Sequence, residues 1–319
     1  MKVVALAGGV GGAKLVDGLA RIIEPADLTV IVNTGDDFEF FGLSISPDLD
    51  SVSYTLAGLA NPVTGWGIKD DTWNTLNQLR SLGGPVWFNM GDKDLATHLE
   101  RTRLLRDGLP LSEVTKHFCQ KWDIQHTILP MSNQKIATKI TDKSGRILDF
   151  QEYFVQNRWE PVVEHIEFAG IELAKPAPGV LESLMDCDLV VVCPSNPYVS
   201  IDPILKVNGL MELISSKTVV AVSPIISGQA VKGPLAKMIQ ELEGAIPSAI
   251  HPAKFYHQLS ILTGYILDST DSKLIPEMER WGIICRAVNT LMLSTSDRVR
   301  LAEDVLALGR LMQRRRSIP

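Results

Sequence analysis

The sequence predicts an α/β fold, specifically a Rossmann-like, doubly wound, mostly parallel sheet with a smaller inserted α+β subdomain. Short apolar runs bounded by turn residues alternate with helix-type repeats along most of the chain. Uninterrupted apolar runs of this length are typical of strands that are buried on both faces of a parallel sheet. We place such strands at residues 2–7, 28–32, 188–193 and 218–222.

The first predicted strand leads directly into a glycine-rich turn and a helix. The turn contains Gly8, Gly9, Val10, Gly11 and Gly12, with Lys14 just beyond it. Glycine lets backbone amides and a helix N-terminus come close to a phosphate. The motif is not a P-loop, and Lys14 stands where a dinucleotide fingerprint needs its third glycine. Taken alone, the turn is also compatible with simple packing of a helix onto a sheet.

Acidic residues follow the second predicted strand. They occur in Asn33-Thr34-Gly35-Asp36-Asp37 and again in Ser46-Pro47-Asp48-Leu49-Asp50. A phosphate cradle and an acidic cluster within one predicted βαβ unit indicate metal-assisted chemistry on a phosphoester. The alternative for Asp48 and Asp50 is helix capping, because both precede a predicted helix.

The rest of the chain completes the domain prediction. Gly65-Trp66-Gly67 predicts a loop, and its indole suits either a core anchor or a stacking platform. Residues 86–88 predict the end of a strand before a helix at 91–98, and helices are expected at 111–122, 177–185 and 297–313. A hairpin at 136–150 places an inserted subdomain at 105–175, between core segments 1–104 and 176–319. Polar loops after two later strands, at 194–200 and 223–228, are expected to face the same crevice as the glycine turn.

Composition excludes several classes of function. The net charge of −6 argues against general affinity for nucleic acid. The four cysteines lack zinc-site spacing, and no apolar stretch approaches the roughly 20 residues of a membrane helix. The first strand is too short for a signal peptide. We therefore expect a cytoplasmic protein.

In combination, these motifs resemble the 2-phospho-L-lactate transferase family. The resemblance runs nearly end to end and is carried by the glycine turn, the two acidic segments and four further stretches: Gly91-Asp92-Lys93-Asp94-Leu95-Ala96-Thr97-His98, Pro194-Ser195-Asn196-Pro197, Val220-Ala221-Val222-Ser223-Pro224-Ile225-Ile226 and Asn289-Thr290-Leu291-Met292. The resemblance implies a Mg²⁺-dependent step in the biosynthesis of the deazaflavin coenzyme F-420. A phospho-hydroxyacid carried on guanosine diphosphate is joined to the ribityl chain of 7,8-didemethyl-8-hydroxy-5-deazariboflavin (Fo), and GMP leaves. It also implies a homodimer.

The resemblance assigns candidate roles to individual residues. Asp50 matches a residue that contacts Fo, and we expect it to orient or deprotonate the reacting hydroxyl. Asp37 and Asp48 are the candidate Mg²⁺ ligands. The donor is expected to be bound by the glycine turn and by three polar side chains: Lys14, Ser195 and Asn196. Trp66, Trp87 and Asn89 are candidates to border Fo.

One position departs from the family pattern. Asn89 is neutral, whereas archaeal members commonly carry a basic residue there. Family members use phospholactate, phosphoenolpyruvate or 3-phosphoglycerate derivatives, and the motifs here favour the enolpyruvyl donor. The alternative function is a non-catalytic nucleotide-sugar-binding regulator of a related family, which has Ala-Asp-Asp-Gly-Gly-Ser in its second loop. A nicotinamide dehydrogenase is disfavoured by the interrupted fingerprint at Lys14.

Overall fold

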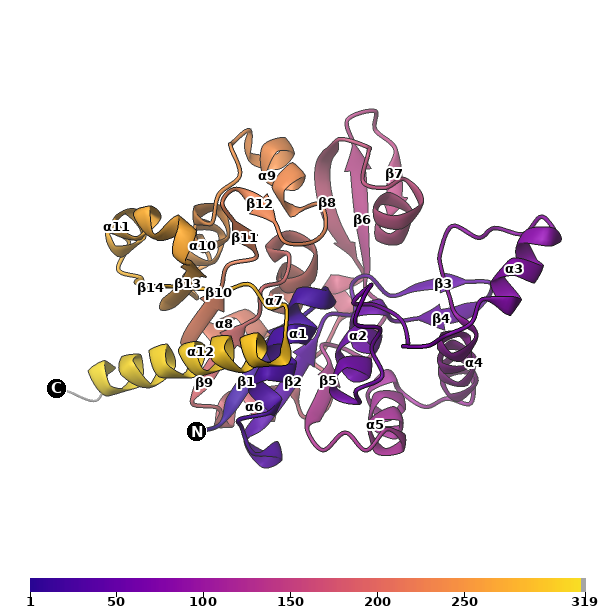
Figure 1. The fold of residues 1–319 in the computed structure, drawn as a ribbon, viewed down its shortest axis with the longest axis horizontal. Helices are drawn as coiled ribbons and strands as arrows, with labels where there is room; N and C mark the ends of the chain where they lie inside the picture. Colours follow the sequence, from indigo (N-terminus) through magenta and orange to yellow (C-terminus); the bar gives the residue numbers. More distant parts are fainter. Residues whose placement is uncertain (317–319) are drawn as a thin grey trace.

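The computed structural model describes residues 1–316, with side chains described as far as Arg314, and is built around a seven-stranded parallel sheet (Figure 1). Each pair of neighbouring strands runs parallel. The strands, in spatial order, are β14 (Ile284–Val288), β13 (Gly264–Asp268), β10 (Thr218–Val222), β9 (Leu189–Val192), β1 (Val3–Ala7), β2 (Leu28–Val32) and β5 (Thr127–Pro130). The predicted fold class is confirmed.

The sheet changes winding direction between β1 and β9. From β1 the chain adds β2 and β5 on one side, and from β9 it adds β10, β13 and β14 on the other. In open α/β sheets, the crevice at such a switch point is where ligands bind. The glycine turn follows β1 and the segment Pro194-Ser195 follows β9, so both lie at this crevice.

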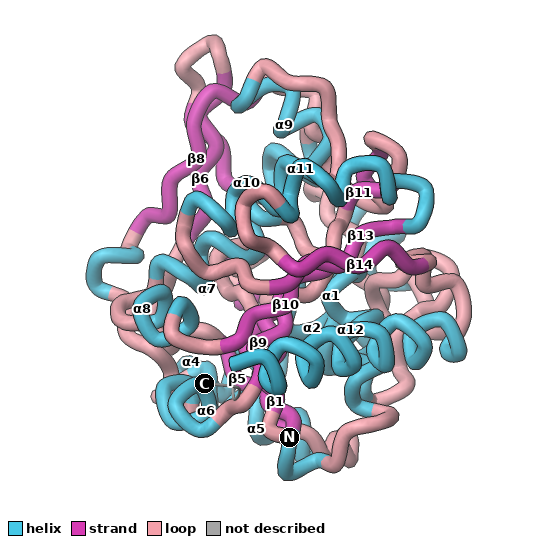
Figure 2. Tube along the Cα trace, turned by 90° about the vertical axis from the view of Figure 1, so that its left-hand side faces the viewer, coloured by secondary structure: helices cyan, strands magenta, loops and turns pink. Residues whose placement is uncertain are grey.

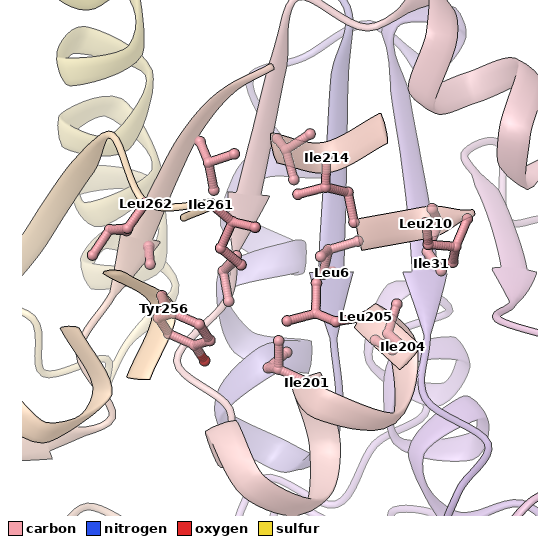
Figure 3. Packing of buried hydrophobic residues seen from close by; sticks show 14 of the residues in the cluster. Leu6, Ile31, Ile201, Ile204, Leu205, Leu210, Ile214, Tyr256, Ile261 and Leu262 are labelled. Carbon is pink, nitrogen blue, oxygen red and sulfur yellow. The ribbon is translucent and has the colours of Figure 1, made fainter. Parts of the chain in front are cut away.

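Helices cover both faces of the sheet. Successive residues of β1 point to opposite faces, so each face of the strand packs against a different set of helices. Val3, Ala5 and Ala7 pack with α1 (Gly9–Ala20) and α12 (Thr295–Arg316). Leu6, on the opposite face, lies among side chains of helices from the second half of the chain, as Figure 3 shows with Leu205 and Leu210. The helices that contribute to this second face are α6 (Val180–Asp186), α7 (Asp202–Lys206), α8 (Leu210–Ser215), α10 (Ile250–Gln258) and α11 (Ile275–Glu279).

An arm extends from the edge of the sheet that carries β5 (Figure 1). It contains the hairpin β3 (Phe38–Phe40) and β4 (Leu43–Ile45) together with α3 (Asn74–Ser81) and α4 (Asp92–Arg106). α2 (Pro47–Leu56) connects this arm to α1. The expected strand at 86–88 is wrong: these residues form a loop, and Trp87 packs against the hairpin aromatics instead.

The segment 105–175, expected to form an insertion, contributes strands to two different sheets. α5 (Leu111–Lys121) packs on β5, and β5 pairs with β2 as the edge strand of the main sheet. The later part forms a separate antiparallel sheet of β7 (Ile147–Asp149), β6 (Ala137–Asp142) and β8 (Val163–Ala169), and Figure 2 shows β6 and β8 standing apart from the main strands. α9 (Leu235–Glu243) packs against this sheet, after the short hairpin β11 (Ile225–Ile226) and β12 (Gln229–Ala230). The small sheet is therefore part of the body of the protein.

Among the described residues, no helix has the length and apolarity that a membrane span requires.

Candidate active site

The glycine turn is packed against both neighbouring loops. A Cβ atom on Gly8 would lie 2.5 Å from Oδ2 of Asp48, and one on Gly11 would lie 2.4 Å from the carbonyl oxygen of Pro194. At Gly12, a Cβ would be 2.8 Å from Oγ of Ser195. These separations are too short for any side chain larger than hydrogen. The turn is therefore where the acidic segment and the Pro194-Ser195 segment meet, as the sequence predicts.

Ser195 and Asn196 hold this arrangement together. The Ser195 hydroxyl donates to the carbonyl of Gly8 at 2.8 Å and accepts from the Gly8 amide at 3.1 Å. Oδ1 of Asn196 accepts from the amide of Tyr198 at 3.0 Å, and its Nδ2 lies 3.4 Å from the Met238 sulfur. Both side chains already have partners within the protein. A contact of either with the donor remains a prediction.

Asn33 organises the acidic cluster. Its Nδ2 donates to a carboxylate oxygen of Asp36 and, at 3.0 Å, to Oδ2 of Asp48, while its Oδ1 accepts from the amide of Gly35 at 2.8 Å. Oδ1 of Asp48 accepts from the amide of Gly9 at 2.6 Å. Asn33 therefore links the loop after β2 to the start of α2, and Asp48 links α2 to the glycine turn.

The carboxyl groups of this cluster are difficult to ionise in the free protein. Burial, together with the charges of Asp48 and Asp37, raises the pKa of Asp36 well above its usual range. Burial likewise raises the pKa of Asp37, although the Ser46 hydroxyl donates to its Oδ2 at 2.7 Å. The pKa of Asp48 rises to about 6, mainly through burial. Crowded buried carboxyl groups of this kind are stabilised by a proton or by a cation.

Asp50 lies in a second polar group, together with side chains of α4. The Arg101 guanidinium donates to its Oδ1, and Nδ1 of His98 lies 3.8 Å from its Oδ2. On the far side of His98, Nε2 lies 3.5 Å from Oδ2 of Asp94, and Asp94 accepts a 2.8 Å hydrogen bond from the Tyr54 hydroxyl. Burial raises the pKa of Asp50, while Arg101 and His98 counteract that shift.

Two carboxylate oxygens in the site are buried and have no hydrogen-bond partner among the described residues. They are Oδ1 of Asp37 and Oδ2 of Asp50. An unpartnered buried oxygen is costly unless it meets a ligand. Oxygen ligands from one or two carboxylates are what Mg²⁺ commonly uses, with substrate phosphates completing its coordination. The donor set therefore fits Mg²⁺. Asp50, Asp94 and His98 also place ligand-type atoms within 4.8 Å of one another, but the Arg101 cation already balances charge there.

Two lysines lie near the glycine turn. Nζ of Lys14 donates to the carbonyl of Met292 at 2.9 Å, and Nζ of Lys232 donates to the carbonyl of Thr64 at 2.6 Å. Burial lowers the pKa of Lys14, and the charges of Arg298 and Lys232 lower it further. Positive charge therefore gathers beside the turn.

The three residues expected to border Fo lie in two loops of the arm, Trp66 in the loop after α2 and Trp87 and Asn89 in the loop before α4. Trp66 is 40% exposed on the loop between α2 and α3, where it lines a small hollow with Trp73 and Asp94. Trp87 packs edge-on against Phe40, with ring centroids 5.0 Å apart, and Asn89 is exposed two residues later. The aromatic contacts of Trp87 are those of a local core. Its role and that of Trp66 in binding Fo remain predictions.

Sequence reasoning missed Arg101 and assigned no role to Lys232. A signal for Arg101 exists, because Asp94, His98 and Arg101 recur at positions i, i+4 and i+7 and therefore share one face of α4. Within this face, Nε2 of His98 lies 3.5 Å from Oδ2 of Asp94. Lys232 stands in a loop with no local pattern, so only the three-dimensional structure places it at the glycine turn.

Comparisons with known proteins show which family this chain resembles. The family model described as "2-phospho-L-lactate transferase CofD" matches residues 3–279. The phosphoenolpyruvate transferase of Streptomyces griseus is 41% identical over 315 residues, covering 97% of this chain and 98% of that protein. The 2-phospho-L-lactate transferase of Methanosarcina mazei is 36% identical over 303 residues, covering 95% and 99%.

A solved structure of a UPF0052 family protein from Bacillus halodurans supports the fold alone. Its TM-score is 0.65 at 16% sequence identity, covering 96% of this chain and 99% of that chain. The family match and the relatives, by contrast, extend over nearly the whole sequence. The chain therefore belongs to the 2-phospho-L-lactate transferase family.

Proposed function

We propose that this protein transfers a phospho-hydroxyacid from a guanosine diphosphate-linked donor to the ribityl hydroxyl of Fo and releases GMP. The observation that carries the proposal is the 2.6 Å hydrogen bond from the Gly9 amide to Oδ1 of Asp48. It joins a phosphate-type cradle directly to a cluster of buried carboxyl groups at the switch point of the sheet. Phosphoryl-type transfer needs this pairing, because catalysis rests on positioning the phosphates and neutralising their charge.

In this proposal, the glycine turn binds the phosphates of the donor. Residues Gly8 to Gly12 offer backbone close to the phosphates, and Lys14 supplies positive charge from the first turns of α1. Lys14 now donates to a backbone carbonyl, a partner that a phosphate would replace with a stronger, charge-assisted one. Ser195 and Asn196 shape the wall on the β9 side, where the guanosine would lie.

Asp50 is the proposed catalytic residue. Its Oδ1 is held by Arg101, while its Oδ2 is buried without a hydrogen-bond partner among the residues that the structure describes. A carboxylate anchored through one oxygen can receive the primary hydroxyl of Fo on the other. This orients the hydroxyl for attack on phosphorus and provides an acceptor for its proton. Asn89, Trp66 and Trp87 are the further proposed Fo contacts.

We propose that the acidic cluster holds Mg²⁺ through Asp37 and Asp48. Asp37 offers a free oxygen, whereas both Asp48 oxygens accept hydrogen bonds, from Gly9 and Asn33. Asp50 is the alternative to Asp48 as the second Mg²⁺ ligand, because its Oδ2 has no hydrogen-bond partner among the described residues. When bound, the ion would neutralise negative charge on the diphosphate. Asp37→Asn should abolish Mg²⁺ stabilisation of the fold; comparing Asp48→Asn with Asp50→Asn then identifies the second ligand.

The relatives favour phosphoenolpyruvate as the three-carbon unit. The S. griseus phosphoenolpyruvate transferase is 41% identical to this chain, against 36% for the M. mazei 2-phospho-L-lactate transferase. We propose the enolpyruvyl donor on this ground.

A cytoplasmic homodimer is the proposed working form, and light scattering of the purified protein measures its mass directly.

A mass-spectrometric assay tests the function. The protein is incubated with Fo, Mg²⁺ and each of three guanosine diphosphate-linked donors in parallel: enolpyruvyl, lactyl and glyceryl. A phosphodiester product of Fo with stoichiometric GMP supports the transferase, and the product mass names the acid. Binding of Fo without product from any donor contradicts the proposed donors. Absence of both product and Fo binding contradicts the whole proposal and favours the nucleotide-sugar regulator.

A further inference from the structure

The loop between α2 and α3 closes over the glycine turn. It forms a small hairpin in which the amide of Asn61 donates to the carbonyl of Gly67 at 3.0 Å and the amide of Gly65 donates to the carbonyl of Asn61 at 2.9 Å. Its tip meets the start of α1, since a Cβ on Gly65 would lie 2.7 Å from a methyl group of Val10. We call residues 61–67 the covering loop. The covering loop lies directly on the turn that we assign to the donor phosphates.

Lys232 holds the covering loop next to this contact with Val10. Its Nζ donates to the carbonyl of Thr64 at 2.6 Å and would be 3.0 Å from a Cβ on Gly65. Lys232 comes from the segment after β12, more than 160 residues away in the chain. The ammonium group therefore lies where the covering loop, Val10 and the glycine turn converge.

The charges around Lys232 favour the binding of an anion. Within the described residues, neither Lys232 nor Lys14 forms an ion pair with a carboxylate, and each donates to a backbone carbonyl. The charge of Lys232 contributes to lowering the pKa of Lys14, so the two ammonium groups repel each other. Arg298, the third cation nearby, is already paired with Asp17 at 3.0 Å. An anion between the lysines would relieve their repulsion.

We propose that Lys232 is a donor-phosphate contact, resting on the function proposed above. In the free protein its ammonium group is held by the carbonyl of Thr64. When the diphosphate enters beside the glycine turn, Lys232 donates to a phosphate oxygen, and the covering loop loses its fastening and shifts. A neutral carbonyl is a weaker acceptor for an ammonium group than a phosphate, so the exchange favours the bound state.

Substitutions at Lys232 distinguish the effect of its charge from the effect of its hydrogen bond to the Thr64 carbonyl. Lys232→Gln keeps a hydrogen-bond donor for the Thr64 carbonyl but removes the charge, and Lys232→Arg keeps both. Lys254→Gln, at an exposed position on α10, is the matched control. Calorimetry measures the affinity of each variant for GDP with Mg²⁺, and for inorganic pyrophosphate, at low and at physiological salt. Hydrogen exchange of the covering loop is recorded with and without GDP.

A phosphate contact predicts a graded result. Lys232→Gln should weaken GDP and pyrophosphate binding about ten- to a hundredfold, the range for a lost hydrogen bond to a charged group. Lys232→Arg should lose much less, and Lys254→Gln should match the unmodified protein. GDP should increase exchange in the covering loop of the unmodified protein, because Thr64 loses its partner.

Other results overturn the inference or the function separately. If Lys232→Gln binds GDP like the unmodified protein while Lys14→Ala loses binding, the donor site stands and Lys232 is only a fastening. If pyrophosphate affinity is unchanged but GDP affinity falls, Lys232 serves the guanosine and not the phosphates. If the unmodified protein binds neither probe, the proposed donor site itself is wrong.

Discussion

The Arg101 guanidinium donates a hydrogen bond to Oδ1 of Asp50, and both side chains are buried. The pair joins α4 to the first turn of α2, across 51 positions of the chain. Arg101 also donates to the Ser44 carbonyl at 3.3 Å. Arg101 therefore connects the arm of the molecule to the residue that we propose to act on the acceptor hydroxyl.

Arg101→Met should destabilise the protein strongly. Removing one partner of a buried ion pair leaves the other charge without compensation, at a typical cost of about 3–5 kcal/mol. Urea denaturation measures the change in the free energy of unfolding. Arg103→Met is the matched control, because Arg103 lies on the same helix in an exposed pair with Glu100. Equal effects of the two substitutions would show that the buried Arg101–Asp50 pair contributes no more to stability than the exposed Arg103–Glu100 pair.

Asp50→Asn should reduce turnover far more than donor affinity. Losing a general base typically costs about 10²–10⁴-fold in rate. The substitution also leaves Arg101 without its carboxylate, so stability must be measured beside kcat to separate the two effects. Asp107→Asn, at the exposed end of α4, serves as the control. Full turnover by Asp50→Asn would remove Asp50 from the mechanism.

The acidic cluster should make stability fall as pH rises. The pKa of Asp48 is about 6 in the folded protein, against an ordinary value near 3.8, so the folded state binds protons more tightly than the unfolded state. Its stabilising contribution is fully present below pH 3.8 and is lost as pH rises through about 6. A shift of this size corresponds to about 3 kcal/mol.

Thermal melts from pH 4 to 8, with and without Mg²⁺, measure this effect. The metal-free protein should lose stability over the window from pH 4 to 6 relative to Asp48→Asn. Mg²⁺ should restore stability above pH 6, since a cation can replace the lost protons. Parallel pH profiles for the two proteins without metal would mean that Asp48 titrates normally.

Gly11→Ala should disrupt the junction between α1 and the segment after β9. The new methyl group would lie 2.4 Å from the Pro194 carbonyl oxygen, a backbone atom that cannot move aside cheaply. Overpacking of this kind costs about 1–3 kcal/mol, and displacement of α1 should weaken GDP binding as well. Gly84→Ala is the control, because its nearest contact would be 3.3 Å. Unchanged melting temperature and GDP affinity would contradict the tight junction.

The elements nearest the N-terminus were predictable because local and tertiary requirements coincide there. β1 and β2 are unbroken apolar runs, and the glycines mark the passage from β1 into α1, which begins at Gly9. β5 was assigned to an insertion because Thr127–Pro130 is a short edge strand whose place depends on pairing with distant β2. β13 and β14 were not predicted, since short apolar runs do not distinguish a strand from a buried helix segment.

The sequence predicted the types of chemical group in the candidate site better than the hydrogen bonds that those groups form. Residue types and spacing indicated a phosphate turn beside acidic groups, and the bond between Gly9 and Asp48 confirms that they meet. The Asn33 bridge to Asp48, the Arg101 partner of Asp50 and the position of Lys232 were not predictable. Each depends on segments that the folded chain brings together from separate parts of the sequence.

The hydrogen bonds between Ser195 and Gly8 span 187 positions of the chain. Contacts so distant in sequence form late, because a long chain must close before they can be made. During synthesis, the glycine turn therefore leaves the ribosome without the strand and loop that hold it in shape. A nascent chain truncated before residue 195 should contain β1 and its acidic neighbours yet lack a working phosphate cradle, so the capacity to bind donor should be acquired only after about three-fifths of the 319 residues have been translated.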